Sequence, residues 1–432
     1  MDDFFAFDVN TKITNERMAS IQFPTVSFCN KNPFNLQKNQ SKNLYYLSLI
    51  NDLKKSIFNL SQFHNETFGL MKETNFLISK IILNSTQVDL KDYSFELDEM
   101  LINCELNGIT CNKNDFEHFM LPEFGNCYKF NSGKNLLGNK IEIQSSSIPG
   151  KQNGLRLELF AGFLDQDLSL TRSTGIHLFI HNHSAAIFSQ YDSISLSNGF
   201  DTDIVVSQEH SHKLSKPHSN CIKDPTSFDS FQSGLYRKSI EMFGRYQQKT
   251  CLIMCYDEFI KDTFGCYYPG AIEAKSATFC DYQVFLLATN AYKNFSSSGQ
   301  SWKCFDKCPN ECDTVKFNFK ISQANFPTPF YSQLMIENHK YYPNQARNFS
   351  SYEMVKKSVV AVNVYHDDIS LTLVQETPAM NINQLISNIG GILGICVGMS
   401  ILSFVEIFDI LLKLAIYIFT RNTLTRVQNL DS

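Results

Sequence analysis

The sequence predicts an α+β protein: a disulfide-rich extracellular domain of β-strands flanked by helices, followed by one C-terminal transmembrane helix. Three observations support this. Of the thirteen cysteines, twelve lie between Cys29 and Cys312. Short segments that alternate apolar and polar residues, typical of strands, are separated by Gly, Asn and Ser. A long apolar segment occupies 380–419, near the C-terminus.

The cysteines indicate an oxidising compartment. Twelve cysteines outside the apolar segment predict six disulfides, with Cys396 free. A zinc or redox site is the alternative, because Cys251 and Cys255, and likewise Cys304 and Cys308, are separated by three residues. No nearby pair of histidines completes a zinc finger, so we favour disulfides and expect no metal.

N-glycosylation sequons also favour an extracellular domain. They all precede the apolar segment. The seven acceptors are Asn39, Asn59, Asn65, Asn84, Asn182, Asn294 and Asn348.

The periodicities predict the elements in order. Strands are expected over 21–29, 124–133, 154–160 and 175–182. Helices are expected in 43–83 (two or three), 237–263 and 280–293. Two alternating segments, 358–366 and 369–376, predict a hairpin about an Asp367-Asp368 turn.

The apolar segment is long enough to span a bilayer with tilt, at about 1.5 Å per helical residue. It is interrupted only by Glu406, Asp409 and Lys413. Arg421 and Arg426 follow it, so the positive-inside rule predicts a cytoplasmic tail over 420–432.

The glycines and acids of this segment allow two interpretations. Gly390, Gly394 and Gly398 recur every four residues, which is typical of close helix packing in an anchor. In that case Asp409 pairs with Lys413. Around a symmetric axis, however, Glu406 and Asp409 would form rings that concentrate cations. A pore explains glycines and acids together, so we favour it.

Several motifs resemble the degenerin/epithelial sodium channel family. "GGILGICVGMSILSFVEIFD" (390–409) resembles its second membrane helix. "FPTVSFCNKNPF" (23–34), "FGNCYKFNSG" (124–133) and "KLSKPHSNC" (213–221) resemble ordered motifs of its ectodomain, and the cysteines of 251–312 resemble its thumb domain. The match extends along nearly the whole chain.

The resemblance implies a hand-like ectodomain and a homo- or heterotrimer with related subunits. It implies a sodium-selective, amiloride-sensitive cation channel of the plasma membrane, multi-pass in the full-length family member. Partners would then be sodium ions and membrane lipid. By position, the resemblance implies these roles: selectivity filter at Gly398, Met399 and Ser400; gate region at Ser387, Asn388, Gly390 and Gly391; pore acids Glu406 and Asp409.

The family's cysteine order also implies a pairing that spacing alone cannot select. The implied pairs are Cys29–Cys127, Cys104–Cys111, Cys221–Cys312, Cys251–Cys308, Cys255–Cys304 and Cys266–Cys280.

The start of the chain departs from the family, which has two membrane helices. "MDDFFAFDVN" has neither a basic nor an apolar leader, and residues 1–22 resemble the strand and linker after the first membrane helix. We therefore expect that helix to be missing here. The expected domains are this linker, a cysteine-rich domain over 23–379 with a thumb-like region at about 237–312, a pore helix over 380–419 and the tail.

Alternatives remain open at this stage. A non-conducting channel paralogue, or a single-pass disulfide-rich receptor or adhesion ectodomain, fits a chain with one span. Catalytic motifs are missing, so we expect neither an enzyme nor a cofactor. A net charge of −5 gives no reason to expect nucleic acid.

The gating stimulus is not predicted. Members of the family open to protons, peptides or force, and an extracellular peptide ligand stays open here. Residues 282–305 contain no Asp or Glu, which disfavours the acid-pocket mechanism. His177, His181 and His183 share one strand parity, and His210 and His212 form a second pair. We favour solvated or hydrogen-bonded strand histidines over a proton or metal site.

Overall fold

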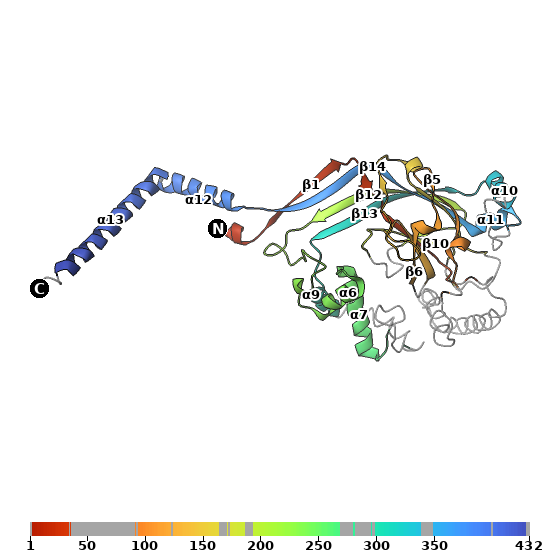
Figure 1. Cartoon of the computed structure of the whole chain (residues 1–432), viewed down its shortest axis with the longest axis horizontal. Coiled ribbons are helices and arrows are strands. Elements are labelled where there is room, and N and C mark those ends of the chain that lie inside the picture. Colours follow the sequence, from red (N-terminus) through yellow and green to blue (C-terminus); the bar gives the residue numbers. More distant parts are fainter. Residues whose placement is uncertain are drawn as a thin grey trace. The chain divides into compact units, whose positions relative to one another are not determined.

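The computed structural model describes residues 2–33, 35, 91, 94–121, 124–163, 171, 173–185, 193–267, 280, 295, 299–337, 349–398 and 401–428. The chain forms two compact units. The larger comprises Lys12–Ser215 and Asn220–Gln375, and the smaller comprises Met1–Thr11, Lys216–Ser219 and Glu376–Ser432. Figure 1 labels the elements along the chain.

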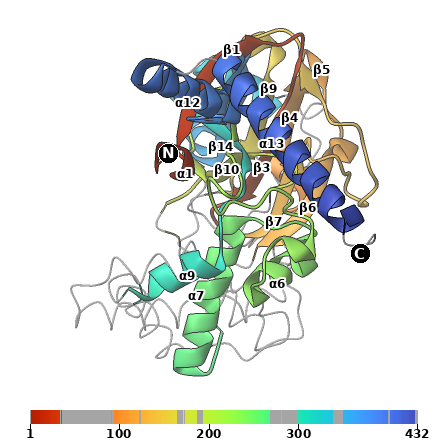
Figure 2. The ribbon, with the colours of Figure 1, turned by 90° about the vertical axis from the view of Figure 1, so that its left-hand side faces the viewer.

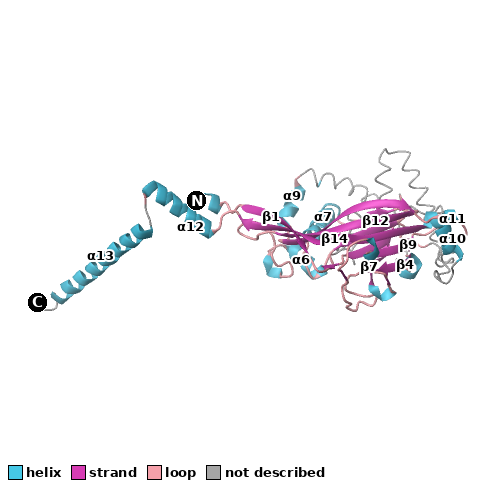
Figure 3. Ribbon diagram, turned by 90° about the horizontal axis from the view of Figure 1, so that it is seen from above, coloured by secondary structure: helices cyan, strands magenta, loops and turns pink. Residues whose placement is uncertain are grey.

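A seven-stranded sheet with the order β13-β12-β14-β9-β4-β5, and with β1 paired to β14, organises the larger unit. Its long central strands are visible in Figure 3. β12 runs antiparallel to β13 and parallel to β14. The strands are β1 (Val9–Arg17), β4 (Leu101–Leu106), β5 (Ile109–Thr110), β9 (Leu155–Phe160), β12 (Phe200–His212), β13 (Asp313–Asn325) and β14 (Val359–Pro378).

The predicted hairpin about Asp367-Asp368 is wrong. β14 is one strand of 20 residues that continues through these two aspartates. Its pairing with β12 is interrupted there instead, because the partner of Val206 is His366 and the partner of Gln208 is Leu371. The extra residues form a bulge, so the two acidic residues interrupt the ladder without turning the chain.

A five-stranded sheet has the order β11-β10-β3-β7-β6, and β2 pairs with β8. Val26 and Phe28 of β3 share one buried core with Leu157 of β9 and Val362 of β14. The two larger sheets therefore bury their apolar faces in a common core. The strands are β2 (Ile21–Gln22), β3 (Thr25–Asn30), β6 (Phe116–Leu121), β7 (Gly125–Phe130), β8 (Ser145–Ser146), β10 (Ile176–His181) and β11 (Ile194–Leu196).

Short helices flank the sheets. Figure 2 shows α6, α7 and α9 grouped together. The predicted helix over 237–263 is divided into α6 and α7, because Gly244 adopts the left-handed conformation (φ 72°) and ends α6. The helices of the larger unit are α5 (Leu97–Met100), α6 (Gly234–Phe243), α7 (Gln248–Phe264), α9 (Gln300–Lys307), α10 (Pro329–Glu337) and α11 (Tyr352–Ser358). The helices predicted in 43–83 and 280–293 lie outside the described residues.

The smaller unit contains α1 (Asp2–Phe5), α12 (Ile382–Val397) and α13 (Ile401–Gln428). Its N-terminal segment contacts the start of the α12 segment through a hydrogen bond from the Ala379 amide to the Asp8 carbonyl (2.8 Å). His218 also bonds the Phe7 carbonyl through Nδ1 (2.7 Å). Three segments that are distant in sequence are thus joined within this unit.

Candidate functional site

Disulfides connect α7 to α9. Cys251 and Cys255 lie one turn apart on α7 and bond Cys308 and Cys304. Spacing of four residues places both thiols on one helix face, so two parallel bonds fix α9 against α7. A third bond, Cys221–Cys312, closes the base of this region next to β13.

The described residues contain six disulfides. These are the six pairs that the family resemblance implied. Their partners lie 4.5–5.9 Å apart between Cα atoms, within the ordinary range for disulfides. Because the pairing closes long loops of 98 and 91 residues, only the tertiary structure brings these thiols together.

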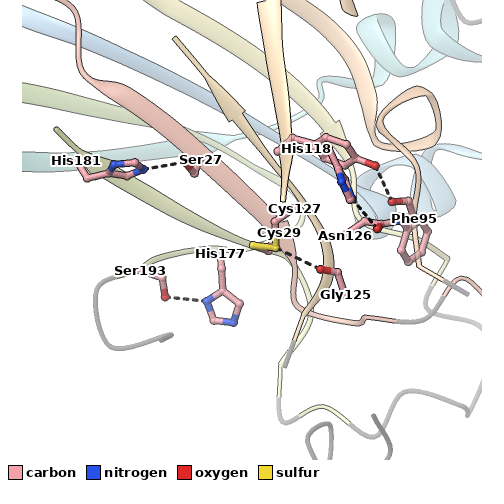
Figure 4. The surroundings of a disulfide bond; sticks show 11 residues. Ser27, Cys29, Phe95, His118, Gly125, Asn126, Cys127, His177, His181 and Ser193 are labelled. Atoms are coloured by element: carbon pink, nitrogen blue, oxygen red, sulfur yellow. Dashed lines mark hydrogen bonds between the residues drawn. A yellow bond between two sulfur atoms is a disulfide. The ribbon is translucent and has the colours of Figure 1, made fainter. Parts of the chain in front are cut away.

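The histidines of β10 each have a hydrogen-bond partner near the Cys29–Cys127 bond. Figure 4 shows His181 beside Ser27, with Nε2 and Oγ 2.8 Å apart, and His177 beside Ser193. The His177 Nδ1 lies 2.8 Å from the Ser193 hydroxyl. These contacts agree with hydrogen-bonded strand histidines.

His183 bonds the Asn131 carbonyl through Nδ1 at 2.8 Å. Burial and, to a smaller extent, the nearby Lys31 ammonium together lower the pKa of His177 to about 3. His177 is therefore neutral at physiological pH. The second pair differs: His210 contacts Gln208, whereas His212 forms an exposed pair with Asp313 at 2.6 Å.

The predicted gate residues lie on α12. Asn381 caps this helix, since its side chain accepts from the Gln384 amide and the Gln384 side chain accepts from the Asn381 amide. Ser387 and Asn388 follow two turns later, and all of α12's described side chains are at least partly exposed. A Cβ at Gly390 or Gly391 would meet no atom within 4 Å.

α12 ends at the predicted filter. Gly398 adopts the left-handed conformation (φ 64°) and is the C-cap of α12. α13 begins at Ile401, so the continuous helix predicted over 380–419 is instead two helices. Glycine has no Cβ to oppose this conformation, which explains the break at this residue. Met399 and Ser400 lie outside the described residues.

Both predicted pore acids lie on α13. Asp409 Oδ2 is 2.6 Å from Lys413 Nζ. Glu406 lies about one turn before Asp409, is exposed, and forms no ion pair with any residue that the structure describes. The acids thus differ in environment: one has an adjacent cation on its own helix and the other does not.

Large apolar side chains surround these acids. On α13 they are exposed in every direction around the helix, including Phe404, Val405, Ile407 and Phe408. Neither helix, over its described residues, combines the length and the apolar character that a membrane crossing requires. The predicted membrane span therefore stays a prediction.

The remaining predicted site residues are glycosylation acceptors. Asn182 lies in a turn directly after β10 and is partly exposed. The other six acceptors, Asn39, Asn59, Asn65, Asn84, Asn294 and Asn348, lie outside the described residues.

Sequence reasoning missed two features. The first is a small polar network, in which Asn363 of β14 donates to both Asp201 and Asp203 of β12. The Lys151 ammonium lies 2.6 Å from Asp203. The second feature is His366, which is fully buried beside the β14 bulge. The spacing of Asp201 and Asp203 could have indicated a shared strand face, but nothing in the sequence indicated the partners.

Comparison with known proteins gives a consistent result. The family model "Amiloride-sensitive sodium channel" matches residues 1–410. The epithelial sodium channel subunit gamma of Pelodiscus sinensis is 27% identical over 319 residues, which cover 73% of this chain and 45% of that protein. The subunit alpha of Homo sapiens is 25% identical over 329 residues, covering 75% and 46%.

The gamma subunit of Xenopus laevis is 24% identical over 336 residues, covering 77% of this chain and 48% of that protein. The aligned part thus spans less than half of each of these relatives. The family model, however, covers nearly the whole chain, and the ordered motifs and the six disulfides agree with it. This chain belongs to the amiloride-sensitive sodium channel family.

Proposed function

We propose that this chain is a subunit of a trimeric, sodium-selective, amiloride-sensitive cation channel of the plasma membrane. The observation that supports this most strongly is the family match over residues 1–410, which includes α12 and the acids of α13. The related proteins of turtle and human are named as epithelial sodium channel subunits. Related subunits are the proposed partners, and sodium is the proposed permeant ion.

The chemistry of the C-terminal helices agrees with a pore. A helix that is apolar in every direction needs lipid or protein around it, since water would meet its side chains otherwise. α13 has such a surface and also has Glu406 on it. A carboxylate in apolar surroundings costs at least about 2.5 kcal/mol unless it faces water or a cation. In a trimer, the three Glu406 carboxylates would face a common axis, where both water and cations would reach them.

The break between α12 and α13 supports the proposed filter. Gly398 ends the helical hydrogen bonding of α12, and the left-handed residue redirects its carbonyl. Carbonyl oxygens that no helix uses can replace part of the hydration shell of a cation. The proposed ion path runs past Ser387 and Gly391 to this break and then past Glu406.

The larger unit would then be extracellular. Its cysteines all form disulfides within the described residues, which requires an oxidising compartment. Asn182 is partly exposed in a turn, as glycosylation requires.

The test is co-expression of this chain with a related channel subunit in oocytes. We expect the chain to co-purify with that subunit, and its presence to change the amiloride-sensitive sodium current. Gly398→Trp, which fills the proposed filter, should reduce that current while assembly persists. Absence of association would refute a shared channel. Association with an unchanged current in both wild type and Gly398→Trp would refute a pore role.

A further inference from the structure

His366 occupies an unusual position at the junction of β12 and β14. It is only 2% exposed, and it is the last residue of β14 paired in register before the bulge. Beyond the bulge, pairing resumes between Gln208 and Leu371. His366 therefore marks the end of the continuous ladder between these two strands.

The hydrogen bonds of His366 define its protonation state. Nδ1 lies 3.2 Å from the Val206 carbonyl, which can only accept, so Nδ1 bears the proton. In the neutral ring Nε2 is then unprotonated and carries a lone pair. This nitrogen is buried and has no hydrogen-bond partner among the described residues. A second proton on Nε2 would therefore have no acceptor.

The surroundings of the ring are apolar or already paired. Phe23 packs edge-to-face against it, with ring centroids 5.9 Å apart. On the same strand, Asp368 is exposed. The charged side chains on neighbouring strands and loops pair with one another: Lys151 with Asp203 and Asp201, and Asp367 with Lys320.

Burial lowers the pKa of His366, and the bond to the Val206 carbonyl opposes this only in part. No charged group contributes to the shift. The folded junction therefore excludes a proton that an opened junction accepts.

We propose that His366 is an acid-sensitive latch: protonation of its Nε2 opens the junction formed by Val206–Gln208 of β12 and His366–Leu371 of β14. In neutral solution the ring closes the junction through Val206. In acid the imidazolium needs water at Nε2 and can reach it only when the strands separate at the bulge. The bulge is the weak point because its residues lack partners on β12.

Hydrogen–deuterium exchange of the full chain in detergent tests this. After correction for intrinsic exchange, protection of junction amides should fall about tenfold for each pH unit below about 6.5, because opening binds one proton. Peptides from β4 are the internal reference, since β4 has no histidine. Their protection reports global opening, so it should stay above that of the junction amides throughout the pH range.

His366→Asn should abolish this pH dependence, because the amide can still donate to Val206 but does not titrate. The matched control is His212→Asn, at an exposed histidine of β12, which should behave as the wild type. If the protection of the junction amides still fell with pH in His366→Asn, the proposal would be overturned. So would constant protection in the wild type, or junction amides that exchange no faster than those of β4, which would indicate global unfolding. The wild-type result decides alone if the variant does not fold.

Discussion

Asp409 and Lys413 form an ion pair along one face of α13, with Oδ2 and Nζ 2.6 Å apart. The sequence had offered this pair as the anchor interpretation and the acid rings as the pore interpretation. The two interpretations need not exclude each other. Lys413 compensates Asp409, whereas Glu406 keeps an uncompensated charge within the described residues. The proposed pore would then depend on Glu406 more than on Asp409.

Neutralising Glu406 should therefore reduce cation conductance. In the co-expressed channel, we expect Glu406→Gln to lower single-channel conductance roughly twofold at low salt, where screening is weakest. Asp409→Asn should have a smaller effect on conductance. Because this change alone would leave Lys413 without its partner, the matched control is the double variant Asp409→Asn with Lys413→Gln. Equal conductance in the wild type and Glu406→Gln would show that this carboxylate does not face the ions.

The break at Gly398 should depend on its left-handed conformation. Gly398→Ala adds a Cβ that meets no atom, so its cost is conformational alone, about 1–2 kcal/mol. Gly391→Ala is the control: its Cβ also meets no atom, but Gly391 is helical. We expect Gly398→Ala to shift the reversal potential under sodium and potassium, and Gly391→Ala to leave it nearly unchanged. Identical reversal potentials would count against a filter at the break.

His177 should make the chain less stable in acid. Its pKa falls from 6.5 to about 3 on folding, so between these values the unfolded chain binds the extra proton. The contribution of His177 to the free energy of unfolding is then fully present above pH 6.5. It is lost as the pH falls, by about 1.4 kcal/mol per pH unit. His177→Asn should weaken this slope in thermal unfolding between pH 7.5 and 4.5. His212→Asn, at an exposed ring, should not, and a slope unchanged by His177→Asn would refute the assignment.

Gly175 should tolerate no side chain. Its φ is 125°, and a Cβ would lie 2.0 Å from the Leu196 carbonyl oxygen, where β10 pairs with β11. Gly138 also has a positive φ, 79°, but a Cβ there would meet nothing within 4 Å. Gly138→Ala should cost about 1–2 kcal/mol from strain alone. Gly175→Ala should cost more, measured by denaturant unfolding, and equal costs would show that the backbone contact is not maintained.

Much of this protein followed from the sequence. The strands predicted over 154–160 and 175–182 agree with β9 and β10. Alternation of apolar and polar residues is a local pattern, so it can be recognised without knowing the neighbouring strands. The cysteine number predicted disulfides, and the resemblance supplied their pairing. The motifs from Phe23 to Asp409 led to the family that the comparison then showed.

The tertiary structure decided what depends on distant partners. β14 stays one strand through Asp367 because β1 and β12 both pair with it, which no local pattern predicts. Hydropathy describes average character and not dihedral angles, so the break at Gly398 was invisible within an apolar segment. His366 has an ordinary strand position in the sequence. Only the burial of its ring, with Phe23 packed against it, makes its protonation costly, and the bond to the Val206 carbonyl opposes this in part.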